Sequence, residues 1–239
     1  FRPNLDDVKR FLDEDASPKA IFLNSPHNPT GGVATEDDLK GLADLVRGRN
    51  IVVFSDEPYC HMVWKGRHHS LLEQPGMMDQ CVAAYTFSKS FSMSGWRLGY
   101  AVSSPETVKV FDVLTNTALS CVPPFVQMAG IAALQNDLQE RDKNMATFRQ
   151  KVEYLAGQLD ALPDINCLTP GGSFYVFPDV SAICHRFNIT SHGLAMYLLE
   201  AADDEFGVAC LGGECFGEAL SDSCGVCSGG NSGHGADSD

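Results

Sequence analysis

The sequence predicts an α/β fold, namely part of a doubly wound, mostly parallel sheet followed by an incomplete α+β domain. Three short apolar runs of the kind that form buried strands support this, because helix-length or loop connections separate them. The runs are Ala20–Asn24, Ile51–Phe54 and Cys81–Phe87. Each leads into a loop, and ligands of doubly wound sheets gather beyond the carboxyl ends of the strands. We therefore expect the three loops to share one site.

Helices are predicted before and between these strands. Residues Asp6–Leu12 carry apolar side chains on one side of a short helix. Thr35 and Asp38 have the spacing of a capping box, with Asp in place of the usual Glu, and Gly48 ends the helix that follows. After the third strand, the apolar run Leu98–Val102 predicts a return strand.

The second half of the chain is predicted to be mainly helical up to Pro163, where its character changes. We expect residues 1–162 to form part of a large domain and residues 163–219 an incomplete smaller domain. The predicted helices are Pro105–Leu114 (with Ser104 as N-cap), Phe125–Asn136, Glu140–Leu162 and Ser191–Ala202, and the predicted strands are Cys167–Thr169, Phe174–Phe177 and Val208–Leu211.

Composition narrows the classes of function. The 239 residues carry a net charge of −14, which argues against binding nucleic acid or an anionic membrane through bulk electrostatics. No apolar run has the length of a membrane span, and the first residues lack the layout of a signal peptide. The nine cysteines are odd in number and scattered, which indicates reduced thiols and a cytoplasmic protein.

The last twenty residues differ from the rest. Residues 220–239 consist mainly of glycine, serine and aspartate, so they cannot bury enough apolar surface to offset their ordering entropy. We expect a disordered tail. The pair Cys224–Cys227 has no second pair and no histidine at zinc-ligand spacing, so no metal site is predicted.

The stretch Thr86–Tyr100 carries the strongest chemical signal. Lys89 follows two hydroxyl residues, Thr86 and Ser88, and Arg97 comes eight positions later. At a strand end, such a lysine can act as a covalent amine, while hydroxyls and a guanidinium hold a phosphate. The alternative is a surface Ser-Lys pair beside an unrelated arginine, since lysines and serines are mostly exposed.

Two further loops follow the first and second strands. One reads Asn28-Pro29-Thr30-Gly31, which taken alone is typical of a plain turn. The other contains Asp56 and Tyr59, and an acid after a strand is often a helix cap. His61, His68 and His69 are expected in a surface loop. The order and spacing of these two loops together with Lys89 and Arg97 argue against the simple turn reading.

Together these motifs resemble class I/II aminotransferases, the fold type I pyridoxal-phosphate enzymes. The resemblance covers nearly all of residues 20–217, and the GWRLG and DEPY strings bring it closest to the aspartate-aminotransferase-like subgroup. The lysine signature is a hydroxyl, an apolar residue, a hydroxyl, the lysine, a short small-residue loop, arginine, an aliphatic residue and glycine. Those places hold Thr86, Phe87, Ser88, Lys89, Arg97, Leu98 and Gly99.

The resemblance implies a role for each loop. Lys89 would form an aldimine with pyridoxal 5'-phosphate and then act as general base and acid on the substrate. Asp56 would face the ring nitrogen and keep it protonated. The resemblance also implies that the full-length parent is a homodimer. The other implied cofactor-binding residues are Asn28 and Tyr59 at the ring oxygen and Thr86, Ser88 and Arg97 at the phosphate.

The implied activity is transfer of an amino group between an amino acid and a 2-oxo acid, as part of amino acid metabolism and biosynthesis. The alternatives are a C–S or β-lyase of the same fold and a catalytically dead fragment that binds cofactor or dimerises.

The sequence also departs from the family pattern. Thr86 stands where Ser or Gly is more usual, and neither the upstream glycine-rich loop and stacking aromatic nor the arginine after the GECFG-like segment is found. We therefore expect an N-terminally incomplete chain with an atypical C-terminus, and a poor or inactive catalyst.

Overall fold

The computed structural model describes residues 2–203 and 205–216, which fall into two compact units. The first unit is Phe1–Glu153 with Pro170–Tyr175, and the second is Tyr154–Thr169 with Val176–Asp239. The domain boundary expected at Pro163 stays a prediction. No helix in the two described ranges is long and apolar enough to cross a membrane.

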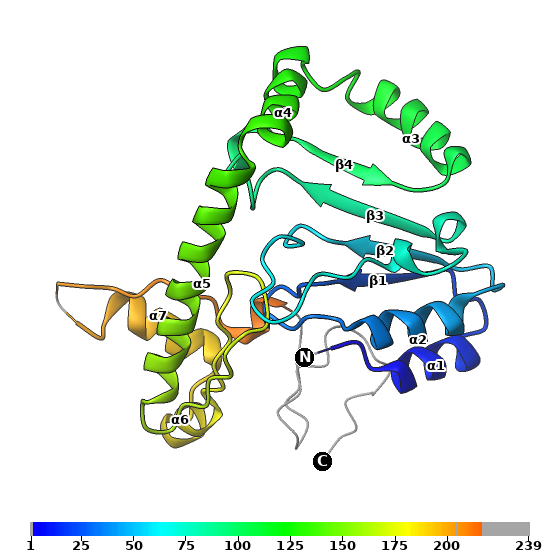
Figure 1. The fold of residues 1–239 in the computed structure, drawn as a ribbon. Coiled ribbons are helices and arrows are strands. Elements are labelled where there is room, and N and C mark those ends of the chain that lie inside the picture. Colours follow the sequence, from blue (N-terminus) through cyan, green and yellow to red (C-terminus); the bar gives the residue numbers. More distant parts are fainter. Residues whose placement is uncertain (1, 204, 217–239) are drawn as a thin grey trace. The chain divides into compact units, whose positions relative to one another are not determined.

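A four-stranded sheet forms the centre of the first unit (Figure 1). Its strands lie in the order β1 (Ala20–Asn24), β2 (Val52–Asp56), β3 (Cys81–Thr86) and β4 (Gly99–Val102). The first three strands are parallel, and β4 returns antiparallel to β3. The mixed α/β fold with a mostly parallel sheet is thus confirmed, as is the return strand.

The strand register aligns the carboxyl ends of β1, β2 and β3. Asn24, the last residue of β1, is opposite Asp56, the last residue of β2, and Asp56 is in turn opposite Ala84 on β3. The loops that follow these strands consequently leave the sheet at one edge. The three predicted motifs, which contain Asn28, Asp56 and Lys89, lie at these strand ends and in these loops.

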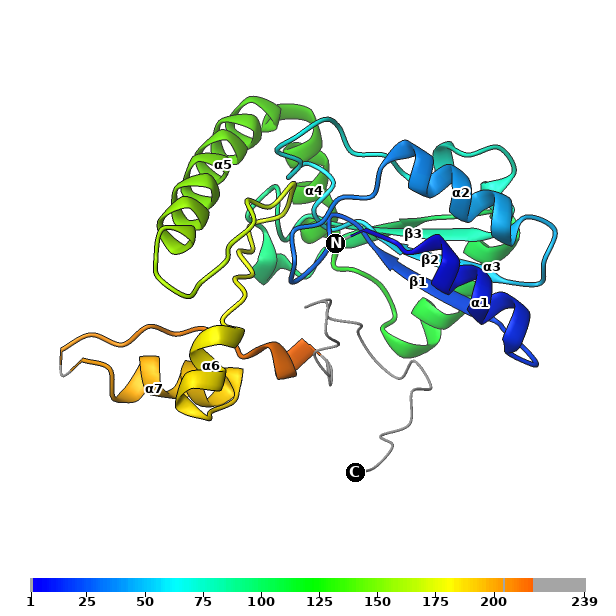
Figure 2. The ribbon, with the colours of Figure 1, turned by 90° about the horizontal axis from the view of Figure 1, so that it is seen from below.

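Helices cover both faces of the sheet (Figure 2). On one face, α1 (Leu5–Glu14) and α2 (Glu36–Val46) pack through fully or nearly fully buried leucines and valines into the main core. On the other face, Phe111 of α3 (Pro105–Ala118) shares the lining of a small hollow with side chains of β2 and β3. A doubly wound arrangement follows, because consecutive side chains of a strand point to opposite faces.

The helix termini follow the predicted capping chemistry. Thr35 and Asp38 form a reciprocal capping box at the start of α2, and Gly48, just beyond its end, has a left-handed φ of 75°. Ser104 caps α3 by accepting a hydrogen bond from the Thr107 amide. Local sequence therefore sets these boundaries.

The remaining helices complete the described part of the chain. The predicted helices appear as α4 (Pro124–Asn136), α5 (Leu138–Asp160) and α7 (Ser191–Glu200), whereas α6 (Ser181–Phe187) was not predicted. Short 3-10 turns occur at η1 (Leu71–Glu73), η2 (Met77–Asp79), η3 (Ser94–Trp96) and η4 (Gly213–Phe216).

The three strands predicted after Pro163 are wrong. Residues 167–169, 174–177 and 208–211 form no strand, and only isolated bridges occur nearby, at Asn166–Asp179 and Val63–Gly172. The cause is that these segments lack a strand to pair with. The Gly171 and Gly172 amides donate to Gly31, and the Val208 amide donates to Leu198 at the end of α7.

Two predictions concern residues outside the described ranges. The disordered tail, 220–239, and the pair Cys224–Cys227 both lie there.

Candidate active site

Asp56 ends β2 with its side chain on the face opposite the main core. Its neighbour Ser55 is buried on the core side, so the alternation along the strand directs Asp56 away from it. Partial burial raises the pKa of the Asp56 carboxyl above its ordinary value, and the charge of Glu57 raises that pKa further. A cation placed beside Asp56 would favour the ionised form of its carboxyl and so lower its pKa.

Asn28 and Tyr59 lie close to Asp56. The Tyr59 hydroxyl interacts with the Asn28 side chain and stands 2.9 Å from the hydroxyl of Tyr175. Burial raises the pKa of Tyr59, and the contact with Tyr175 raises it further, so the phenol remains protonated and can donate a hydrogen bond. Only 2% of Tyr59 is exposed, which fixes its position.

A distant segment completes this part of the site. A Cβ added at Gly31, whose φ is 68°, would stand 2.3 Å from Pro170 Cβ, and one at Gly172 would stand 2.6 Å from the Met62 carbonyl oxygen. Glycine is therefore required at both positions for residues 170–175 to approach. The segment is also held by Trp64 Nε1, which donates to the Ser173 carbonyl at 2.7 Å.

Lys89 lies in the loop after β3, against aromatic rings. Its Nζ is 5.3 Å from the ring centre of Phe174 and 5.7 Å from that of Tyr59. Both rings lie within the range of cation–π attraction. The loop is closed by the Phe87 amide, which donates to the Leu98 carbonyl at 3.1 Å, so the amine projects from a structured turn.

The predicted phosphate-binding residues occupy the end of the β3–β4 hairpin. Thr86 Oγ1 accepts a hydrogen bond from the Ser88 amide at 3.0 Å. Arg97 is exposed, has a left-handed φ of 53°, and donates from its guanidinium to the Ser94 carbonyl at 2.8 Å. The described contacts thus connect Asn28, Asp56, Tyr59 and Lys89, whereas Arg97 is bonded within its own loop.

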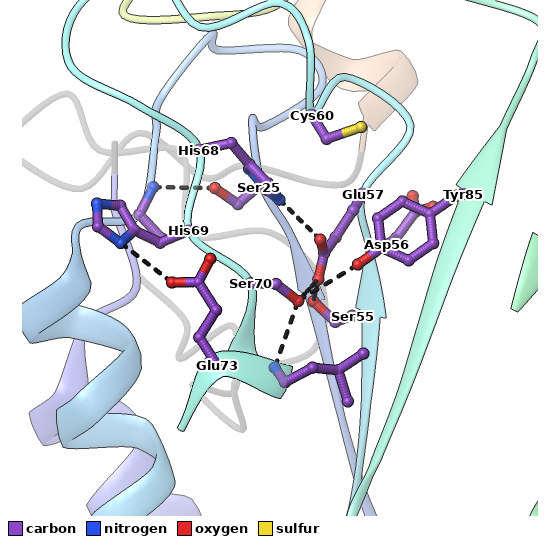
Figure 3. A network of polar contacts seen from close by, with 12 residues as sticks. Ser25, Ser55, Asp56, Glu57, Cys60, His68, His69, Ser70, Glu73 and Tyr85 are labelled. Carbon is purple, nitrogen blue, oxygen red and sulfur yellow. Dashed lines mark hydrogen bonds and ion pairs between the residues drawn. The ribbon is translucent and has the colours of Figure 1, made fainter. Parts of the chain in front are cut away.

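Behind the site, the buried carboxylate of Glu57 holds a polar network (Figure 3). Only 1% of Glu57 is exposed, and it accepts hydrogen bonds from Ser55 at 2.8 Å, from Ser70 at 2.7 Å and from His68 at 2.7 Å. Burial opposes ionisation, but these three hydrogen bonds outweigh it and hold the pKa of Glu57 below its ordinary value. The network fastens the loop that precedes η1 to the end of β2.

The three histidines lie outside helices and strands, as predicted, but two of them are partly buried. His68 and His69 keep only 16% and 14% of their side chains exposed, whereas His61 is exposed. His68 Nε2 pairs with the buried carboxylate of Glu57, and His69 Nδ1 lies 3.6 Å from Glu73 Oε2 (Figure 3). Sequence spacing did not reveal this, because Glu57 and His68 are eleven residues apart.

Three residues near the site were missed by sequence reasoning. Tyr175 comes from a segment 116 residues beyond Tyr59, and no local pattern signals that contact. Nothing in the sequence around Glu57, which follows Asp56 directly, indicates that its carboxylate is buried. Asn24 could have been found, since it ends β1 on the same face on which Asp56 ends β2.

The fold and the site together define an α/β domain with a lysine, Lys89, held against aromatic rings after the third strand of its sheet. Comparison with known proteins specifies the family: the chain belongs to the aminotransferases of class I and II, whose family description matches residues 1–230.

Curated relatives agree with this assignment. The aspartate aminotransferase of Sulfolobus acidocaldarius is 30% identical over 216 residues, which cover 90% of this chain and 52% of the relative. A protein of Aquifex aeolicus described as a probable aspartate/prephenate aminotransferase is 34% identical over 226 residues, 91% of this chain and 54% of the relative. The chain therefore spans about half the length of these relatives.

A solved structure gives the same result for the fold. The aromatic aminotransferase of Pyrococcus horikoshii superposes with a TM-score of 0.76 at 29% identity, covering 84% of this chain and 52% of that one.

The Glu57 network predicts a pH-dependent contribution to stability. At pH 7, Glu57→Gln should lower the free energy of unfolding by about 1–3 kcal/mol, because a charged acceptor is lost from a buried site. Since the folded pKa of Glu57 is lowered, this contribution is complete above its ordinary value of 4.5 and is lost as the pH falls through the folded pKa. Denaturant unfolding at several pH values measures it.

The matched control is Glu73→Gln at the end of η1, where the side chain is 42% exposed. Its effect should stay within about 0.5 kcal/mol. A stability gap between wild type and Glu57→Gln that persists unchanged down to pH 3 would contradict the ionised network.

Proposed function

We propose that this chain carries the catalytic lysine of a pyridoxal-phosphate-dependent aminotransferase, which moves an amino group between an amino acid and a 2-oxo acid. The observation that supports this most directly is the placement of Lys89 beside Tyr59, with Asp56 at the neighbouring strand end. Membership of the aminotransferase family supports the same reaction class.

The chemistry of the donor set fits this cofactor. Pyridoxal phosphate, when bound, supplies an electron sink for the electron pair left by a broken Cα bond. A protonated ring nitrogen needs a carboxylate, which Asp56 provides. An anionic ring oxygen needs hydrogen-bond donors, and the protonated phenol of Tyr59 and the side-chain amide of Asn28, which interact with one another, would supply them.

Asp56 has an electrostatic role in this proposal. Two unit charges about 4 Å apart attract by about 4 kcal/mol at an effective dielectric near 20, equivalent to roughly three pKa units. The carboxylate that now has a raised pKa would become fully ionised beside a cationic ring nitrogen. Its partial burial limits competition from water.

Lys89 has two roles in the proposal. Its amine would hold the cofactor, and it would also be the group that takes up and returns the substrate's Cα proton as general base and acid. The rings of Phe174 and Tyr59 restrict where that amine can move.

The phosphate would bind at the β3–β4 hairpin end. The Ser88 amide donates to Thr86 Oγ1 there, the hydroxyls of Thr86 and Ser88 would be its donors, and Arg97 supplies a guanidinium with a fork geometry suited to phosphate. Because Arg97 now donates to the Ser94 carbonyl, phosphate would compete with that contact for the same guanidinium.

We also propose a homodimer in the cytoplasm. Helix α4 exposes Phe125, Met128 and Ile131, which recur at intervals of three residues and form an apolar stripe suited to a partner surface.

The state of the cysteines supports the proposed location in the cytoplasm. The cysteines in the described ranges are all unpaired, which suits a reducing compartment.

The covalent role of Lys89 can be tested by trapping. After incubation with pyridoxal phosphate and borohydride reduction, peptide mass spectrometry should locate the stable adduct on Lys89, because its amine is held at the site while other lysines are solvated. Lys65→Ala should leave the yield unchanged and Lys89→Ala should abolish it. An adduct found mainly on Lys65 or Lys109 in the wild type, and retained in Lys89→Ala, would refute the assignment.

The role of Asp56 can be tested by hydrogen exchange. In Asp56→Asn, exchange of the substrate Cα proton for deuterium, followed by NMR with the cofactor-loaded protein, should slow far more than cofactor affinity falls. The physical reason is that the charge on the ring nitrogen matters most when the Cα–H bond breaks. Equal losses of rate and affinity, or an unchanged exchange rate, would count against this role.

A further inference from the structure

In the described part of the chain, the Asn24 side chain makes three hydrogen bonds, and all of them go to residues of the proposed site. Its Nδ2 donates to the Asp56 carboxylate at Oδ2, at 3.1 Å, and to the Asp56 carbonyl, at 3.0 Å. Its Oδ1 accepts from the Asn28 amide at 2.7 Å. One side chain therefore connects the end of β1, the end of β2 and the start of the Asn28 loop.

We propose that Asn24 is a positioning residue that clamps the Asp56 carboxylate through one oxygen and the Asn28 loop through its backbone amide. The inference rests on the proposed function, because it concerns the same site. Among the described residues, Asp56 Oδ1 accepts no hydrogen bond, so the clamp leaves that oxygen available for a cationic ligand. Asn24 itself is not required to touch the ligand.

The side chain must carry both a donor and an acceptor to make both contacts, as an amide does. The Asp56 carboxylate can only accept a hydrogen bond, and the backbone N–H of Asn28 can only donate one. The group that connects them therefore needs a donor and an acceptor. Aspartate at position 24 would keep the size but place a second carboxylate against Asp56. Alanine would leave both groups without this partner.

The backbone at Asp56 has main-chain partners besides the Asn24 side chain. The Asp56 carbonyl also accepts from the Ser25 amide at 3.2 Å, and the Glu57 amide donates to the Ala84 carbonyl at 2.9 Å. These main-chain bonds hold the strand end on both sides. The rotation of the Asp56 side chain is instead set by Asn24, so a change at position 24 should disturb the carboxylate without unfolding the sheet.

The charges around Asp56 give the clamp a measurable signature. Glu57 follows Asp56 in the chain and its charge disfavours ionisation of Asp56, while Tyr59 on the adjoining turn is a neutral phenol. A donor on Asp56 Oδ2 favours the ionised carboxylate. Removing the donor should therefore move the titration of Asp56 to higher pH.

The first arm of the test needs no cofactor. The side-chain carboxyl of Asp56 is titrated by carbon-13 NMR in the whole chain, with Asp56→Asn used to assign its signal. The midpoint should move upward in Asn24→Ala, and further upward in Asn24→Asp, where two carboxyls compete. The matched control, Asn116→Asp on an exposed turn of α3, should leave it unchanged.

The second arm measures binding of pyridoxal phosphate by visible absorbance. Asn24→Ala should weaken binding about tenfold, the size expected for one hydrogen bond to a charged group. In an Asp56→Asn background the same change should have little further effect, because the two residues would act through one carboxylate. If Asn24 acted only through general stability, Asn24→Ala would instead lower the affinity for pyridoxal phosphate equally in the wild-type and Asp56→Asn backgrounds.

The outcomes separate the two proposals. If the wild type binds no pyridoxal phosphate at Lys89, the proposed function fails, and the NMR arm still decides whether the clamp exists. If Asp56 titrates identically in the wild type and Asn24→Ala, the clamp is overturned whatever the cofactor does. Should Asn24→Ala lose its fold, as judged by thermal unfolding, Asn24→Asp preserves the side-chain size and supplies the same comparison.

Discussion

The in-register parallel pairing of β1 with β2 is the constraint on which the site depends. Because Asn24 is opposite Asp56, both strands end at the same level, and the loops that follow them leave the sheet side by side. A shift of one residue would turn Asp56 toward the main core and Glu57 away from it. Two acids that are adjacent in sequence thus acquire opposite environments, one buried in a hydrogen-bond network and one facing the site.

The second constraint is a close approach between distant segments. Gly31 and Gly172 have no Cβ, so residues 170–175 can lie against the loop that contains Asn28. This approach brings Phe174 and Tyr175 to the lysine and to Tyr59. The aromatic surroundings of Lys89 are consequently built from two segments of the first unit that lie far apart in the sequence, and they depend on glycines that carry no chemistry themselves.

Much of the sheet and its order of motifs could be predicted, because short apolar runs and capping signals are local. The Thr35–Asp38 capping box and the end of β3 before Lys89 are examples, since a few neighbouring residues determine each. The burial of His68 could not be predicted, because it requires the loop to fold back onto Glu57. The strand expected at Phe174–Phe177 failed for a related reason: a strand needs a pairing partner, and the residues just before it bond to the loop carbonyls of Gly31 and Met62 instead of to a strand.

The central claim is that Asp56, Tyr59 and Lys89 surround one ligand, and a crystal structure of this chain with pyridoxal phosphate tests it most directly. The account predicts continuous electron density from Lys89 Nζ to the ligand, with Asp56 beside the ring nitrogen and the phosphate at the Thr86–Ser88 turn. Density for the ligand elsewhere on the chain, or an orientation that places its phosphate at Asp56, would contradict the account.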